Sequence, residues 1–99
     1  MGLKTYKVLS GSMEPEYHVG SVVYVEKSSI DDIEVGDVIT FYINDNTVVT
    51  HRVIDKDNDT ESFHTKGDAN ETEDGGSVAY DKVVGKVVLN VPYLGYILR

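Results

Sequence analysis

Short segments rich in valine and tyrosine alternate along this chain with glycine, asparagine and aspartate. β-Branched and aromatic side chains suit the pleated surface of a sheet, whereas the residues between the segments are typical of tight turns. Strands this close together in sequence favour a mostly β fold, either a small antiparallel barrel or a folded sheet. The 99 residues are enough for one domain, residues 1–99, with one modest core.

The segments predict the positions of the elements. We expect strands at residues 6–9, 21–26, 38–43, 47–54, 61–66 and 83–91. Ser28 and Ser29 are each followed three residues later by an aspartate, which predicts one helical turn over residues 30–33. The sequence Asn-Asp-Asn at 44–46 predicts a tight hairpin turn. Residues 67–80, rich in glycine and acidic residues, are expected to form a loop.

The charge and the missing cysteines exclude several classes of protein. The formal net charge is −8, from 17 acidic and 9 basic residues, and a nucleic-acid partner requires the opposite sign. Without cysteine there are no disulfides and no thiolate metal sites. Residues 55–66 begin like a calcium loop. The sixth position is Thr60 and the twelfth is Lys66, where such a loop needs Gly and Glu, so we expect a solvated turn.

A candidate nucleophile follows the first predicted strand, in the sequence Ser-Gly-Ser-Met-Glu-Pro at residues 10–15. Gly11 allows unusual backbone angles and Pro15 favours an extended residue before it, so the turn can expose the Ser12 hydroxyl beside an amide N–H. Serine and glycine are also ordinary turn residues. These residues by themselves therefore fit a plain turn as well as a catalytic serine.

A serine nucleophile needs a base, and a neutral imidazole, with an unperturbed pKa of about 6.5, suits that role. His18 lies in a predicted turn, and His64 lies in a strand with no other reactive group. His51 lies between Val49 and Val53, and the period of a strand places these three side chains on one face. His51 is either a core histidine with its hydrogen bonds satisfied or, if this face lines a cleft, the base.

An aspartate that accepts the imidazole N–H would hold the base in one tautomer. Asp68 follows Gly67 at a predicted turn, and Asp74 lies six residues further along the same loop. Either could take this role, and either could instead close the loop through its own backbone.

Five segments occur in an order that resembles the type I signal peptidases, most of all the endoplasmic-reticulum type that some bacteria and archaea also carry (the SipW-like branch). They are residues 10–15, Gly-Asp-Val-Ile-Thr-Phe at 36–41, Thr-His-Arg-Val at 50–53, Lys-Gly-Asp-Ala-Asn at 66–70 and Val-Pro-Tyr-Leu-Gly-Tyr at 91–96. The likeness runs from about residue 8 to residue 96. It implies a small domain of coiled antiparallel sheets and a serine endopeptidase that removes signal peptides from exported preproteins.

The resemblance also implies roles for single residues. Ser12 matches the nucleophile, and His51 stands where Lys-type relatives place a lysine before the same Arg-Val pair. Ser10 matches a position whose hydroxyl helps the Ser12 N–H to bind the oxyanion. Asp68 matches the aspartate of a Gly-Asp motif and is favoured as the partner of His51. Asp74 remains the alternative, because some relatives use a later aspartate of this loop. No metal or organic cofactor is needed.

The implied substrate is a signal peptide bound in extended form, as an added strand, with small side chains at the first and third positions before the cut. Members of this family carry transmembrane helices that this chain lacks. We therefore expect a catalytic fragment of a membrane-anchored enzyme, with its catalytic domain on the extracytoplasmic side.

Two other classes of protein share some of these features. A self-cleaving repressor-type protease shares the general β architecture, but it uses a lysine base and cuts its own Ala-Gly bond, and no Ala-Gly dipeptide occurs here. A non-catalytic β module that assists the assembly of surface proteins is the second alternative. The presence of both Ser12 and His51 argues against it.

Overall fold

Seven strands form one continuous antiparallel sheet in the computed structural model, which describes residues 3–7, 22–27, 29–72, 74 and 76–91. The strands are β1 (Leu3–Lys7), β2 (Val22–Glu26), β3 (Val38–Asn44), β4 (Thr47–Asp57), β5 (Ser62–Lys66), β6 (Ser77–Ala79) and β7 (Val83–Val91). Their order in the sheet is β1-β2-β7-β3-β4-β5-β6. The helices in these segments are two single 3-10 turns, η2 (Ile30–Asp32) and η3 (Tyr80–Lys82). The prediction of a mostly β fold is confirmed.

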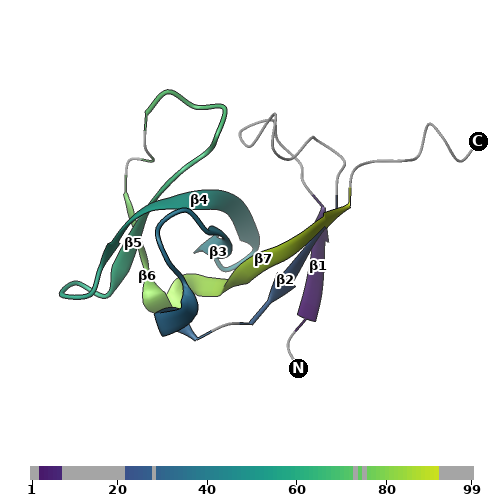
Figure 1. Ribbon diagram of the computed structural model, residues 1–99, viewed down its shortest axis with the longest axis horizontal. Coiled ribbons are helices and arrows are strands. Elements are labelled where there is room, and N and C mark those ends of the chain that lie inside the picture. Colours follow the sequence, from purple (N-terminus) through teal and green to yellow (C-terminus); the bar gives the residue numbers. More distant parts are fainter. Residues whose placement is uncertain (1–2, 8–21, 28, 73, 75, 92–99) are drawn as a thin grey trace, which may run out of the picture.

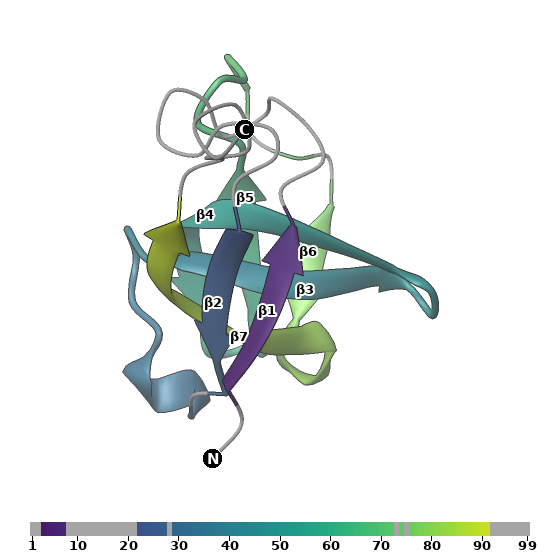
Figure 2. The same cartoon turned by 90° about the vertical axis from the view of Figure 1, so that its right-hand side faces the viewer.

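The sheet coils on itself. In Figures 1 and 2, β7 runs between a half made of β1 and β2 and a half made of β3 to β6. In Figure 2, β1 and β2 stand upright in front of β3 and β4, which run across the view. The pairing register shifts within the β2–β7, β3–β7, β3–β4 and β4–β5 pairs. Such bulges bend a strand and increase its twist, which explains the coiling.

Two groups of buried apolar side chains fill the coil. The larger group lies in the half made of β3 to β6: Ile33, Ile39, Phe41, Val53, Phe63 and Val78. The smaller group lies where β2 meets the other half: Val23, Val25 and Val38. Val23 and Val25 in β2, and Ile39 and Phe41 in β3, are alternate positions of their strands, so each pair points to one face. β3 is covered on both faces, since all four residues from Val38 to Phe41 are buried.

Two local predictions are confirmed. Ser29 caps η2, because its Oγ accepts the backbone N–H of Asp31 at 3.3 Å. The predicted hairpin turn joins β3 to β4, where Asn44 pairs with Thr47 and its Oδ1 accepts the N–H of Asn46 at 2.9 Å. Capping serines and turn asparagines act within a few residues, which is why short sequence patterns predict them well.

Other boundaries differ from the prediction. β1 begins at Leu3, three residues before the predicted strand, and its five described residues all pair with β2. Residues 8 and 9, the predicted end of this strand, lie outside the described residues. β4 continues to Asp57, where its polar residues pair with β5 after a register shift at Ile54. β6 lies inside the predicted loop 67–80, and η3 begins at the last residue of that loop. β6 buries a single side chain, Val78, and so shows no periodicity in the sequence.

Gly85 brings β7 close to β2. A Cβ at this position would overlap the carbonyl oxygen of Glu26 and lie 2.8 Å from its carbonyl carbon. Because both are backbone atoms of a paired strand, Gly85→Ala is expected to lower the free energy of unfolding by about 3 kcal/mol. Urea denaturation measures this change. Gly76→Ala is the control, since its Cβ would meet nothing within 4 Å and should change stability by less than about 0.5 kcal/mol. Equal losses in the two variants would contradict the prediction.

Candidate active site

His51 lies in the middle of β4, which pairs with β3 on one side and β5 on the other. Val53 on the same face is fully buried and Val49 packs against the larger core group, so the predicted sharing of a face is confirmed. The His51 side chain is 12% exposed. Its ring meets Phe41 edge-on, with centroids 6.3 Å apart and an interplanar angle of 73°. The strand and this aromatic contact together fix the position of the imidazole.

Asp74 is the aspartate that is hydrogen-bonded to His51. Its Oδ2 lies 2.7 Å from Nδ1 of the imidazole, and the carboxylate side chain is 29% exposed. The same oxygen accepts the Thr65 hydroxyl at 2.6 Å. The backbone N–H of Asp74 also donates to the Thr65 carbonyl oxygen at 2.8 Å. Because Nδ1 is engaged by a carboxylate, proton exchange with a substrate or nucleophile would take place at Nε2.

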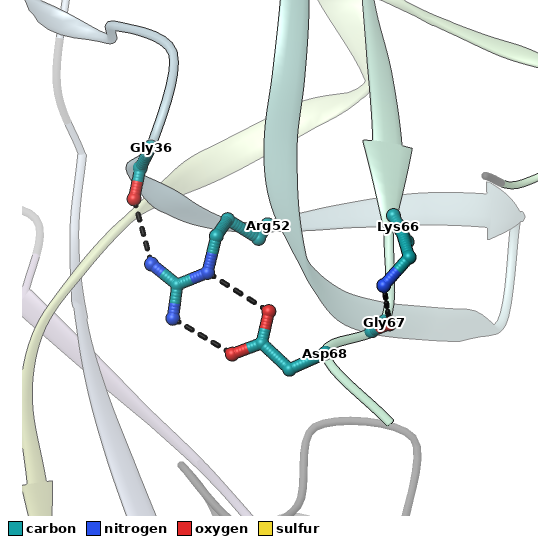
Figure 3. A network of polar contacts seen from close by, with 5 residues as sticks. All are labelled: Gly36, Arg52, Lys66, Gly67 and Asp68. Carbon is teal, nitrogen blue, oxygen red and sulfur yellow. Dashed lines mark hydrogen bonds and ion pairs between the residues drawn. The ribbon is translucent and has the colours of Figure 1, made fainter. Parts of the chain in front are cut away.

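Asp68 is engaged by Arg52, the next residue of β4 (Figure 3). The guanidinium donates from Nε to Oδ1 at 2.9 Å and from Nη2 to Oδ2 at 2.8 Å, and from Nη1 to the Gly36 carbonyl oxygen at 2.7 Å. These hydrogen bonds hold the pKa of the Asp68 carboxyl below its ordinary value, against the opposing effect of partial burial. The positive charges of Arg52 and Lys66 lower this pKa further.

The favoured pairing of Asp68 with His51 therefore does not match the geometry, and the alternative, Asp74, has the hydrogen bond. The register of β4 against β5 explains why. Lys66 pairs with Arg52, so the chain leaves β5 beside Arg52 and reaches Asp68 two residues later. The loop then turns, and the Asn70 N–H donates a hydrogen bond to the Gly67 carbonyl oxygen. It returns to β5 at Thr65, whose carbonyl oxygen accepts the Asp74 N–H.

Thr65 pairs with Val53, and residues directly opposite each other in antiparallel strands point to the same face. Asp74 thus arrives on the face that carries His51. Neither Thr65 nor Arg52 was among the predicted site residues. The Thr-Lys-Gly-Asp order gives no signal for either, because their roles depend on how two strands are aligned.

Ser10, Ser12 and His18 fall outside the described residues, so their roles stay predictions. His64 pairs with Asp55, on the face of β5 opposite to that of Thr65. Within the described segments, no three His, Asp or Glu side chains gather closely enough to hold a metal ion.

The segment that begins like a calcium loop forms a turn instead. The Asp57 carboxylate accepts the backbone N–H groups of Asp59 and Thr60, at 2.9 and 3.3 Å.

A cavity of 290 Å³ opens beside His51. Its lining comes from β3, β4, β5, β6 and the loop before β6: Phe41, Ile43, Val49, His51, Thr65, Asp74, Gly76, Ser77 and Val78. The walls are mostly apolar, and the imidazole and the carboxylate are the ionisable groups among these residues. The arrangement offers a proton acceptor beside space for a small apolar group.

The Arg52–Asp68 pair predicts an acid-dependent part of the stability. A carboxyl with a lowered folded pKa stabilises the fold above its unfolded pKa, and this contribution is lost as the pH falls through the folded pKa. At about pH 6, Arg52→Gln should have a lower free energy of unfolding than the parent chain. Between about pH 6 and about pH 3, that free energy should fall less in Arg52→Gln than in the parent. Urea denaturation at both pH values tests this. Lys82→Gln, which removes one exposed positive charge, is the control and should behave as the parent. An unchanged pH dependence in Arg52→Gln would refute the prediction.

None of the described helices is long and apolar enough to cross a membrane.

Comparison with known proteins points to one family. Residues 1–66 match the family model described as "Signal peptidase, peptidase S26". The chain is 44% identical over 85 residues to signal peptidase I W of Bacillus subtilis, covering 83% of this chain and 45% of that protein. It is 36% identical over 101 residues to the signal peptidase complex catalytic subunit SEC11C of Homo sapiens, covering 91% of this chain and 53% of that protein. Each alignment thus covers about half the length of the relative. In agreement with the resemblance to type I signal peptidases, the chain belongs to the signal peptidase family, peptidase S26.

Proposed function

We propose that residues 1–99 form the catalytic domain of a serine endopeptidase that removes signal peptides from exported preproteins. The observation that carries the proposal is the Asp74 carboxylate on Nδ1 of His51, beside a mostly apolar cavity. Membership of a family whose relatives are named signal peptidases supplies the substrate class. By the same family relation, the full-length protein is anchored in a membrane, with this domain on the extracytoplasmic side.

The mechanism follows from the residue that each ring nitrogen of His51 would face. Nδ1–H donates to Asp74, and Nε2 takes the proton of the Ser12 hydroxyl as its oxygen attacks the scissile carbonyl. Ser10 and the Ser12 N–H bind the oxyanion that forms. The imidazolium then gives its proton to the leaving amine, so an acyl-enzyme remains. Water, deprotonated by His51, releases the acyl group and restores the serine. No metal or organic cofactor takes part.

The cavity beside His51 suggests how the substrate is chosen. An extended peptide added as a strand would point alternate side chains toward this space. Because the walls come from Phe41, Val49 and Val78, they favour a small aliphatic side chain over a charged one. This matches the small residues that precede signal-peptide cleavage sites.

Cleavage of a preprotein in lipid vesicles tests the proposal. The product should begin at the mature N-terminus, with a small residue before the cut, as read by mass spectrometry. Replacing that small residue by Asp should stop cleavage. If neither this chain nor the same chain joined to a membrane-spanning segment cuts any preprotein, the proposed function is wrong.

A further inference from the structure

We propose that Thr65 is a positioning residue that holds the Asp74 carboxylate against Nδ1 of His51. The inference rests on the proposed Ser-His-Asp function and adds a residue to it. Thr65 lies on β5, next to the strand that carries His51, and Asp74 links its hydroxyl to the imidazole.

Thr65 binds Asp74 at two points. Its hydroxyl donates to Oδ2 at 2.6 Å, and its carbonyl oxygen accepts the Asp74 backbone N–H at 2.8 Å. The first bond fixes the carboxylate and the second fixes the loop backbone that carries it. The Asp74 side chain is 29% exposed, so without these bonds it would be a loop side chain with several rotamers to choose from. Two hydrogen bonds from one rigid strand residue remove that choice.

Thr65 itself is well suited to hold another group. It is fully buried, and it pairs with Val53 in the sheet. A β-branched side chain has few χ1 rotamers in such a place, so the hydroxyl points in a defined direction. A buried hydroxyl also costs free energy when it lacks a partner, which favours the conformation in which it binds Asp74.

The Asp74 carboxylate that Thr65 holds in place determines the tautomer of the imidazole. Oδ2 accepts the Thr65 hydroxyl proton and lies 2.7 Å from His51 Nδ1. Since a carboxylate oxygen in this position acts as an acceptor, the hydrogen between it and the ring belongs to Nδ1. Nε2 is then the nitrogen that can accept the proton of Ser12. Loss of the Thr65 hydroxyl would let the carboxylate rotate and would weaken this preference.

The alternative is that Thr65 is only a well-packed strand residue. Thr40 provides a matched comparison within the same sheet. It is also fully buried, and its hydroxyl is hydrogen-bonded to that of Thr50 at 2.7 Å, on β3 and β4 and away from Asp74. Replacing either threonine by Val removes the same hydroxyl from an equally buried place.

The experiment compares Thr65→Val, Thr65→Ser and Thr40→Val with the parent chain. Thr65→Val is expected to lower kcat for preprotein cleavage by about 10- to 100-fold, because the carboxylate is misplaced. KM should change little, because Val is close to Thr in size and the apolar walls of the cavity, Phe41, Val49 and Val78, are unchanged. Thr65→Ser keeps the hydroxyl and should restore most of the activity. Thr40→Val should lose stability to a similar extent and keep the kcat of the folded fraction. Equal kcat losses in Thr65→Val and Thr40→Val would overturn the proposal.

A second measurement does not depend on cleavage. The ¹⁵N shifts of the His51 imidazole report which ring nitrogen carries the hydrogen, and His51→Gln assigns the signal. The parent chain, Thr65→Ser and Thr40→Val should show the Nδ1–H form, whereas Thr65→Val should show a mixture of the two forms. An unchanged Nδ1–H signal in Thr65→Val would overturn the proposal. If the parent chain cuts nothing, the proposed function fails, and the tautomer comparison still decides the role of Thr65.

Discussion

Ser12→Ala and His51→Ala are each expected to lower kcat for preprotein cleavage by about 10⁶-fold. Ser12→Ala removes the attacking oxygen, and His51→Ala removes the imidazole that takes the proton of the serine hydroxyl. Either change therefore disables the same step. For that reason the double variant should be scarcely slower than either single variant. Single-turnover cleavage, followed by gel or mass spectrometry, measures the three rates against the parent chain.

His64→Ala is the control for this prediction. His64 is also a strand histidine, but it lies on the opposite face of β5 from Thr65, so its removal should leave kcat within a few-fold of the parent. Circular dichroism on each variant shows whether the sheet is intact. A folded His51→Ala chain that keeps its cleavage rate would contradict a shared serine–histidine step. So would a double variant whose fold-loss of kcat equals the product of the fold-losses of the two single variants.

Asp74→Asn is expected to lower kcat by about 10⁴-fold while leaving the fold intact. The amide is nearly the same size as the carboxylate, but it has no negative charge and carries donors as well as an acceptor. Facing the Thr65 hydroxyl and Nδ1 of His51, it favours the tautomer with the hydrogen on Nε2. That tautomer cannot accept the proton of Ser12, and the imidazolium formed during attack loses its counter-ion.

Asp68→Asn is the matched control, since it makes the same chemical change six residues earlier in the same loop. Its carboxylate holds Arg52 with two hydrogen bonds, and Arg52 in turn holds the Gly36 carbonyl (Figure 3). The expected result is a lower free energy of unfolding and a kcat, per folded molecule, within about tenfold of the parent. A greater loss of kcat in Asp68→Asn than in Asp74→Asn would reverse the assignment of the two aspartates.

The sequence alone predicted features that depend on neighbouring residues. Alternation along residues 47–54 placed Val49, His51 and Val53 on one face, because successive side chains of any strand point to opposite sides. The sequence also predicted the Asn-Asp-Asn turn and the cap at Ser29, since each is closed by a hydrogen bond between residues two positions apart. The order of five short segments predicted the family, which the match over residues 1–66 confirms.

Only the tertiary structure decided which aspartate meets His51. Asp68 and Asp74 lie in one loop, and nothing in their spacing separates them. The separation comes from the β4–β5 register, which shifts at Ile54 and sets Thr65 opposite Val53 and Lys66 opposite Arg52. Since a shift of one residue turns every side chain to the other face, this register determines whether an aspartate arrives beside Arg52 or beside His51. It arises from the packing of two strands together, and neither strand specifies it by itself.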